Sequence, residues 1–259
     1  MFLGLDIGSV TTKAALISSN HSVLAFDVIP TTFDRETGAK NVMESVLSAV
    51  GASNRDVKKI VATGYGRKII SFRDEAVSEI ICHAEGTVKI RPEVRTIIDI
   101  GGQDSKVIAL NPEGKIDRFE MNDKCAAGTG RFLEVLAERI LDIELTGMGP
   151  LSLNSRTPCV ISSVCTIFAE SEVVSYLSEK RSRADITAGL HLAIAKRIIN
   201  MGASSQIRFD EPVCFSGGVA KNTGVVRAIS EQLGKPIVTL DEPQLPASLG
   251  AAILAERMK

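Results

Sequence analysis

Two stretches of the sequence, LGLDIGSVTTKAALI at residues 3–17 and TIIDIGGQDSKVIAL at residues 96–110, are near copies of each other. Aligned on Asp6 and Asp99, each reads Asp-Ile-Gly, then a small residue, and then has a lysine seven positions after the aspartate. Glycine lets the backbone turn sharply and approach a ligand closely, and successive exposed N–H groups in such a turn form an anion site. The repeat therefore predicts two related loops that hold opposite sides of one polyphosphate.

The segments around the two loops alternate between strand and helix patterns. Apolar runs bounded by Ser, Asn and Gly turns predict strands over residues 2–5, 13–17, 23–29, 106–110 and 116–121. Apolar residues three and four apart predict helices over residues 39–50, 131–141, 169–177, 185–200 and 246–258. Strands followed by helices, twice over, indicate an α/β fold of two related lobes.

The division between the lobes is expected near Thr96. The N-terminal lobe then covers residues 1–95 and the C-terminal lobe covers residues 96–259. The sequence leaves open whether the last helix, residues 245–259, packs back on the first lobe.

The bulk composition is that of an ordinary globular protein. The chain has 259 residues, 44% hydrophobic and 24% charged, with a formal net charge of −1. No apolar run approaches the roughly 18 residues of a membrane helix, and Asp6 interrupts the apolar N-terminus where a signal peptide would need its core. The net charge of −1 argues against a nucleic-acid binder, for which a basic patch would be expected. We therefore expect a cytoplasmic protein with neither a membrane nor a nucleic acid as partner.

The residues of the two loops can supply phosphate and magnesium contacts. Asp6 and Asp99 are expected at strand ends, where a carboxylate can hold Mg²⁺ through water. A third glycine turn, FSGGVAKN at residues 215–222, would let the backbone approach a flat base or ribose. The predicted nucleotide contacts in these turns are Gly8, Ser9, Val10, Thr11, Thr12 and Lys13, then Gly101, Gly102 and Gln103, and finally Gly217 and Gly218.

Two phosphate loops and one base loop resemble the layout of the acetate-and-sugar-kinase, heat-shock-70 and actin superfamily. That resemblance covers nearly the whole chain and implies duplicated ribonuclease-H-like, actin-like ATPase lobes around a nucleotide cleft. It implies ATP or ADP with Mg²⁺ as ligands. As a hypothesis, Asp6 with Asp99 or Asp104 organises Mg²⁺ and the attacking water, while Glu134 and Gln244 touch the nucleoside.

Five cysteines are an odd number with no C-x-x-C pair, which argues against a disulfide scaffold. Cys125 and Cys165 stand out because each is expected just before a helix, whose positive N-terminal end favours an anion such as a thiolate ligand. From the residues alone, two half-buried thiols without a metal remain the alternative. The other three, Cys82, Cys159 and Cys214, are interpreted as structural.

A narrower resemblance is carried by several long motifs in a fixed order. Together they resemble the activator component of 2-hydroxyacyl-CoA dehydratases, an ATPase group that includes the benzoyl-CoA reductase ATPase subunits, over residues 3–255. The motifs are ATGYGR, IDIGGQDSK, MNDKCAAGTGRFLE, SSVCTIFAESEV and SGGVAKN.

The resemblance implies an ATP-dependent one-electron donor. It implies a homodimer with one four-iron four-sulfur cluster, held by Cys125 and Cys165 of each subunit, so that four helix N-termini point at it. A reduced ferredoxin or flavodoxin would supply the electron. ATP hydrolysis would change the angle between the cluster-bearing helices, and an iron–sulfur dehydratase or reductase component would receive the electron.

Two other classes of function remain open at this point. A small-molecule kinase of the same fold, such as a pantothenate-type kinase, would have no use for paired cysteines. A non-catalytic actin-like scaffold that binds ATP without a cluster would have no use for them either. A colourless protein that holds no iron after reconstitution would favour the kinase, whereas the scaffold should form filaments with ATP.

Overall fold

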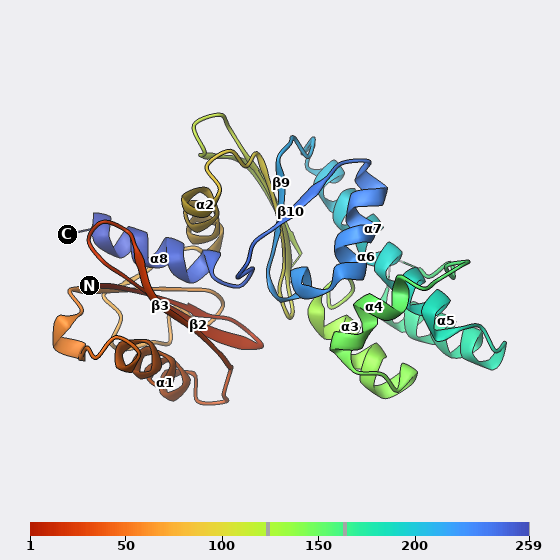
Figure 1. The fold of residues 1–259 in the computed structure, drawn as a ribbon, viewed down its shortest axis with the longest axis horizontal. Helices are drawn as coiled ribbons and strands as arrows, with labels where there is room; N and C mark the ends of the chain where they lie inside the picture. The colour runs from red at the N-terminus through yellow and green to blue at the C-terminus, as the bar shows by residue number, and fades with distance from the viewer. Residues whose placement is uncertain (123–124, 163–164, 259) are drawn as a thin grey trace. The chain divides into compact units, whose positions relative to one another are not determined.

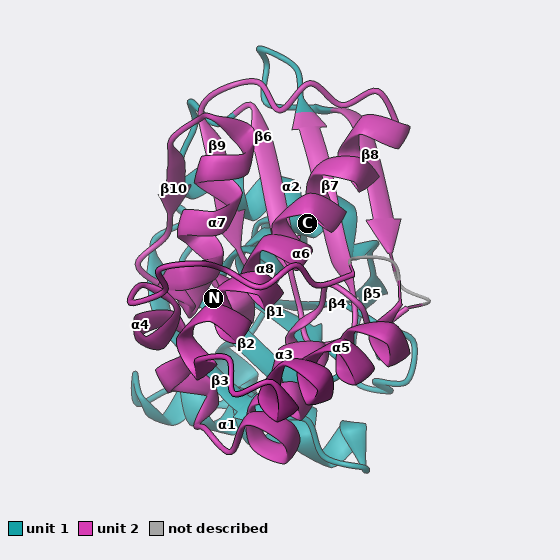
Figure 2. Cartoon of the chain, turned by 90° about the vertical axis from the view of Figure 1, so that its right-hand side faces the viewer, with its two compact units in different colours: residues 1–94, 110–116, 244–259 teal, residues 95–109, 117–243 magenta. Residues whose placement is uncertain are grey.

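In the computed structural model, the chain forms two compact units (Figure 2). Unit 1 comprises Met1–Val94, Leu110–Ile116 and Gln244–Lys259, and unit 2 comprises Arg95–Ala109 and Asp117–Pro243. The structure describes residues 1–122, 125–162 and 165–258. Two residues of each cysteine motif therefore lie outside the described residues.

Unit 1 is built on a five-stranded mixed sheet with the strand order β3-β2-β1-β4-β5. β1 pairs antiparallel with β2 and parallel with β4. Its strands are β1 (Phe2–Ile7), β2 (Thr11–Ile17), β3 (Val23–Pro30), β4 (Lys59–Thr63) and β5 (Glu75–Ala76). Its helices are α1 (Arg35–Ser48), the 3₁₀ turn η1 (Asn54–Asp56), α2 (Glu79–Ile90) and α8 (Pro246–Arg257).

Alternate residues of β1 face opposite layers of unit 1, as the two-residue period of a strand requires. Leu3 and Ile7 are fully buried in a cluster with α1, whereas Phe2 belongs to a cluster with α8. A Cβ added to Gly4 would lie 1.9 Å from the backbone oxygen of Ser248, so α8 approaches the β1 backbone directly. The helices α1 and α8 lie on opposite sides of this sheet (Figure 1).

Unit 2 repeats this sheet. Its strand order, β10-β9-β6-β7-β8, places β6 between an antiparallel β7 and a parallel β9, just as β1 lies between β2 and β4. The strands are β6 (Thr96–Ile100), β7 (Ser105–Leu110), β8 (Ile116–Asn122), β9 (Val213–Ser216) and β10 (Ile237–Thr239). Two mixed sheets of the same order confirm the predicted duplicated α/β fold.

The remaining helices belong to unit 2, where α6 and α7 lie on one side of the sheet (Figure 1). Ile98 and Phe215 of the sheet share one buried cluster with Leu190 of α6. The elements are α3 (Gly130–Leu136) with a π-helical turn η2 (Ala137–Leu141), η3 (Leu145–Gly147), α4 (Met148–Ser152), α5 (Thr166–Ser178), α6 (Arg183–Ser204), η4 (Gly218–Lys221) and α7 (Thr223–Leu233). No helix in the described part of the chain is both long enough and apolar enough to cross a membrane.

Candidate functional site

The first phosphate loop, residues 6–13, is a tight hairpin between β1 and β2. The Gly8 N–H donates to the Thr11 carbonyl at 3.1 Å, and Lys13 Nζ lies 2.8 Å from Asp6 Oδ2. The expectation that the strand ends before Asp6 is wrong, because β1 continues to Ile7 and Asp6 pairs in register with Lys13. The carboxylate is therefore held by both the sheet and the ammonium group.

The second phosphate loop, residues 99–106, has the same geometry with one added charge. The Gly101 N–H donates to the Asp104 carbonyl at 2.9 Å, and Lys106 Nζ lies 3.0 Å from Asp99 Oδ2. Lys106 Nζ also lies 3.0 Å from Asp104 Oδ2. At the position of Asp104 the first loop has Thr11, a neutral side chain. Only the second loop thus offers a further carboxylate for Mg²⁺ or for a nucleophilic water.

The predicted phosphate contacts differ in accessibility. Thr12 is fully buried, and its Oγ1 lies 2.9 Å from Thr31 Oγ1, which donates to the Gly8 carbonyl at 3.0 Å. Thr12 therefore stabilises the loop through Thr31 and is too buried to contact a phosphate. The other predicted contacts in the two loops are half-buried or exposed: Gly8, Ser9, Val10, Thr11, Lys13, Gly101, Gly102 and Gln103.

A glycine with a positive φ packs directly against the carboxylate of each buried aspartate. Gly64 follows β4 with φ +83°, and Gly217 follows β9 with φ +84°. A Cβ on Gly64 would lie 2.4 Å from Asp6 Oδ1, and a Cβ on Gly217 would lie 2.6 Å from Asp99 Oδ1. Gly64 was missed as a site residue. The signal was present, since a hydroxyl residue followed by glycine ends an apolar strand in both lobes.

A chain of hydrogen-bonded side chains, Ser152, His191 and Asn222, ends at the last residue of the third glycine turn, residues 215–222. Asn222 caps α7 with its side-chain oxygen, and its Nδ2 lies 3.2 Å from Nε2 of His191. Because the amide nitrogen is a donor, Nε2 accepts, and the hydrogen on Nδ1 is donated to Ser152 Oγ at 3.0 Å. Burial lowers the pKa of His191 to about 4, so the ring is neutral near pH 7.

The two residues predicted to touch the nucleoside lie in different units. Gln244 Nε2 donates to Thr11 Oγ1 at 3.4 Å and therefore lies beside the first phosphate loop. Glu134 Oε1 lies 2.8 Å from Arg131 Nη1 on the first turns of α3. The Gly130 N–H that starts this helix donates to the Gly101 carbonyl, so α3 begins on the second phosphate loop.

The expectation that each cysteine lies directly before a helix is confirmed for Cys165 and wrong for Cys125. Cys165 is the N-cap residue of α5, directly before its first turn. Cys125 is not followed by a helix, because Gly128 adopts a φ of +80° and α3 starts only at Gly130. The first two N–H groups of α3 donate to the second phosphate loop and are therefore not directed at Cys125.

The thiols divide into two classes. The five cysteines form no disulfide with one another; Cys125 and Cys165 are half-buried, and Cys82, Cys159 and Cys214 are buried. Burial raises the pKa of the Cys82 thiol to about 12, which suits a structural residue. Two accessible thiols per chain fit half of the donor set of a cubane cluster.

Metal ligands do not converge within the part of the chain that the structure describes. No group of three or more His, Cys, Asp or Glu residues that could hold a metal ion is found there. Carboxylates next to lysines, as at Asp6 and Asp99, fit an Mg²⁺ held mainly through water and nucleotide oxygens. A cluster would need thiols from a second copy.

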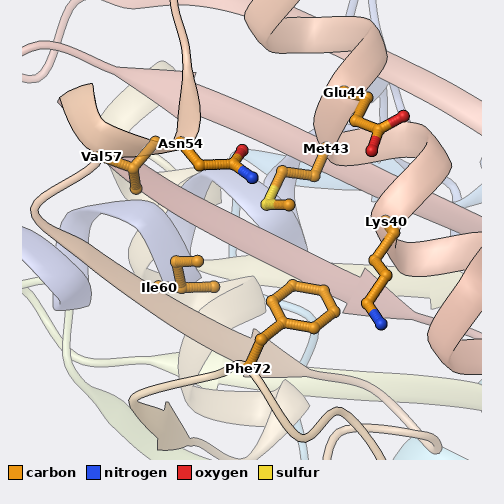
Figure 3. A pocket seen from close by; sticks show the side chains of 7 residues that line it. All are labelled: Lys40, Met43, Glu44, Asn54, Val57, Ile60 and Phe72. Atoms are coloured by element: carbon orange, nitrogen blue, oxygen red, sulfur yellow. The ribbon is translucent and has the colours of Figure 1, made fainter.

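A separate surface cavity of about 260 Å³ lies in unit 1 (Figure 3). Met43 of α1, Ile60 of β4 and Phe72 form its apolar part, and Lys40 and Glu44 come from α1. The Lys40 ammonium lies 5.7 Å from the centre of the Phe72 ring. None of the predicted site residues lines this cavity.

The sequence is similar to a known ATPase family and to several named proteins. The BadF/BadG/BcrA/BcrD ATPase family matches residues 3–255. The chain is 45% identical to the 2-hydroxyisocaproyl-CoA dehydratase activator of Clostridioides difficile over 98% of its own length and 94% of the relative's. It is 41% identical to the (R)-2-hydroxyglutaryl-CoA dehydratase activating ATPase of Acidaminococcus fermentans, over 98% and 96% of the two lengths.

A solved structure of such an activator is also similar. The activator of the 2-hydroxyisocaproyl-CoA dehydratase from Clostridium difficile, with bound ADPNP, matches with a TM-score of 0.92 and 44% identity. The match covers 100% of this chain and 95% of that chain. These comparisons confirm the resemblance to the dehydratase activators and the actin-like ATPase fold.

Proposed function

The chain belongs to the BadF/BadG/BcrA/BcrD ATPase family, and on that premise we propose that it is an ATP-driven activator of a 2-hydroxyacyl-CoA dehydratase or a related iron–sulfur reductase. It would donate one electron at low potential, taken from a reduced ferredoxin or flavodoxin. The repeated Asp–Lys hairpin, combined with two half-buried free thiols in unit 2, carries the proposal.

In the proposed mechanism the two phosphate loops bind the phosphates of ATP with Mg²⁺. Lys13 and Lys106 neutralise negative charge, and loop N–H groups donate to phosphate oxygens. Phosphoryl transfer depends mainly on positioning and charge. We assign Asp104 to orient the nucleophilic water, because the second loop alone has this additional carboxylate and Lys106 fixes it at 3.0 Å.

Cys125 and Cys165 are proposed to hold a four-iron four-sulfur cluster together with the same residues of a second copy of the chain. When bound, the cluster would supply a one-electron redox centre. At the N-cap of α5, Cys165 lies at the positive end of that helix, which would stabilise a thiolate ligand. Cys125 would be held by its loop, where Asn122 Nδ2 donates to the Cys125 carbonyl at 2.8 Å.

The proposal is tested by anaerobic activation of a 2-hydroxyacyl-CoA dehydratase component, with titanium(III) citrate as the reductant. The wild-type protein should activate the dehydratase only when ATP and Mg²⁺ are present. Cys165→Ser should lose activation but keep ATP binding, whereas Cys159→Ser, six residues earlier and buried, should behave as wild type. Activation without ATP, or full activation by Cys165→Ser, would overturn the proposal.

A further inference from the structure

The second phosphate loop is joined to helix α3 by two backbone hydrogen bonds. The Gly130 N–H donates to the Gly101 carbonyl and the Arg131 N–H donates to the Gly102 carbonyl, each at 2.8 Å. Gly130 and Arg131 are the first residues of α3, and the N–H groups of a first helical turn have no acceptor within the helix. The carbonyls of the loop therefore cap this helix.

The contact is close enough for the loop and the helix to move together. A Cβ added to Gly130 would lie 3.1 Å from the Gly101 oxygen, 3.3 Å from Val219 Cγ2 and 3.5 Å from the Gly102 Cα. Glycine at this position lets the helix backbone reach the loop backbone with no side chain between them.

The short segment between Cys125 and α3 has little slack. The Thr129 N–H and Oγ1 both donate to the Ala126 carbonyl, at 3.1 and 2.6 Å, and Thr129 is fully buried. Asn122, which precedes Cys125 in the sequence, donates from Nδ2 to the Cys125 carbonyl at 2.8 Å. A displacement of the first turn of α3 is therefore passed on to Cys125.

Peptide planarity links the two faces of the loop. The Gly101 carbonyl shares a rigid plane with the Gly102 N–H, and the Gly102 carbonyl shares one with the Gln103 N–H. In a trans peptide the carbonyl and the N–H point in opposite directions. A phosphate that accepts a hydrogen bond from the Gly102 or Gln103 N–H would rotate that peptide plane, and the carbonyl of the same plane is bonded to α3.

We propose that these two hydrogen bonds couple the state of the bound nucleotide to the position of Cys125. This inference rests on the proposed function and assigns Gly130 as a positioning residue. Coupling between two sites is reciprocal, so a change at Cys125 alters nucleotide affinity by the same factor. The coupling is thus a property of the polypeptide and is measurable without a cluster.

The test replaces the donor N–H by proline. Gly130 is the first helical residue, a position that accepts proline, and Thr129 before it is extended with φ −120° and ψ 169°. Gly130→Pro removes one of the two hydrogen bonds, and its ring separates the helix from the Gly101 oxygen that the N–H approaches at 2.8 Å, while the loop sequence is unchanged. The matched control is Arg183→Pro, at the exposed first residue of α6 in the same unit.

The measurement is the rate at which iodoacetamide alkylates Cys125 in the full-length, cluster-free protein, followed by mass spectrometry. It is made at saturating magnesium ADP and at a saturating non-hydrolysable ATP analogue, so that altered affinity has no effect. In the wild type and in Arg183→Pro the two rates should differ about five-fold or more, the lower range of allosteric coupling. In Gly130→Pro we expect a difference of less than about two-fold.

The outcomes separate this inference from the proposed function. A wild type that binds both nucleotides but shows equal alkylation rates overturns the inference alone, as does a folded Gly130→Pro that keeps the wild-type difference. A wild type that binds neither nucleotide overturns the proposed function, and the inference with it.

A milder variant decides the case if Gly130→Pro does not fold. Gly130→Ala keeps the donor but crowds the Gly101 oxygen, and it should reduce the difference between the two rates. Its control is Gly147→Ala, whose added methyl group meets nothing within 4 Å. An unreduced difference in Gly130→Ala overturns the inference.

Discussion

Lys106 is the most buried cation of the candidate site, with 4% of its surface exposed. It bridges two carboxylates, those of Asp99 and Asp104, in a loop where charge could not be left unpaired. Lys13 is its counterpart but bonds a single carboxylate and is more exposed. Both lysines therefore have a structural role beside the role toward phosphate that we propose for them, and the structural role is larger in unit 2.

Replacement of Lys106 by methionine should destabilise the protein by about 3–5 kcal/mol, because it leaves two carboxylates without their cation. Arg227→Met is the control, since it removes an exposed ion pair with Glu231 in the same unit and should cost at most about 1 kcal/mol. Urea unfolding measures both values. Equal losses in the two variants would show that the buried pair does not stabilise unit 2.

His191 gives the protein a defined dependence on pH. Its folded pKa, lowered by burial to about 4, lies below the ordinary value of 6.5, so the unfolded chain takes up the proton first. The stabilisation is complete above pH 6.5 and is lost as the pH falls toward 4. As the pH falls from 6.5 to 4, the free energy of unfolding of the wild type should decrease by on the order of 3 kcal/mol more than that of His191→Gln. Parallel pH profiles of the two proteins would contradict the assignment.

At the scale of elements, the strand–turn repeat was predictable because its signals are local. Asp-Ile-Gly after an apolar run and a lysine seven residues later fix the hairpin and its register. The start of α3 was predicted to within one residue, at Arg131 against Gly130, but Cys125 was wrongly expected directly before it although four residues intervene. The pair Gly128-Thr129 was the contrary signal, a left-handed turn followed by a capping residue type.

Gly64 and Gly217, which pack against Asp6 and Asp99, allow a test of the repeated hairpin. Gly64→Ala and Gly217→Ala should each lower the rate of ATP hydrolysis by roughly ten- to a hundred-fold, because the new methyl group displaces a carboxylate that must be positioned closely. Gly51→Ala and Gly234→Ala are matched controls, with φ of +65° and +63° but nothing within 4 Å of an added Cβ. The controls share the positive φ, at a cost of about 1–2 kcal/mol. Gly217, with ψ 173°, lies in a region essentially limited to glycine and carries more strain than Gly234, with ψ 28°. Equal losses of activity in all four variants would attribute the effect to strain.

At the scale of the whole molecule, the sequence supports the family and the duplicated fold because motifs from both units occur in a fixed order. It could not show that α3 is anchored on the second phosphate loop, since that contact joins residues 29 positions apart through backbone atoms alone. No side-chain pattern encodes such a contact. The two cysteines accordingly have different surroundings, with Cys165 at a helix N-terminus and Cys125 on a loop that leads into the helix bonded to residues 101 and 102.

Iron and acid-labile sulfide analysis of the anaerobically purified protein tests the central claim most directly. The wild type and Cys159→Ser should contain about two iron atoms and two sulfides per chain, half of one cubane cluster. Cys125→Ser and Cys165→Ser should contain almost none and still bind ATP. Iron retained in both of these variants, or absent from the reconstituted wild type, would contradict an ATP-driven electron donor with its cluster at these residues.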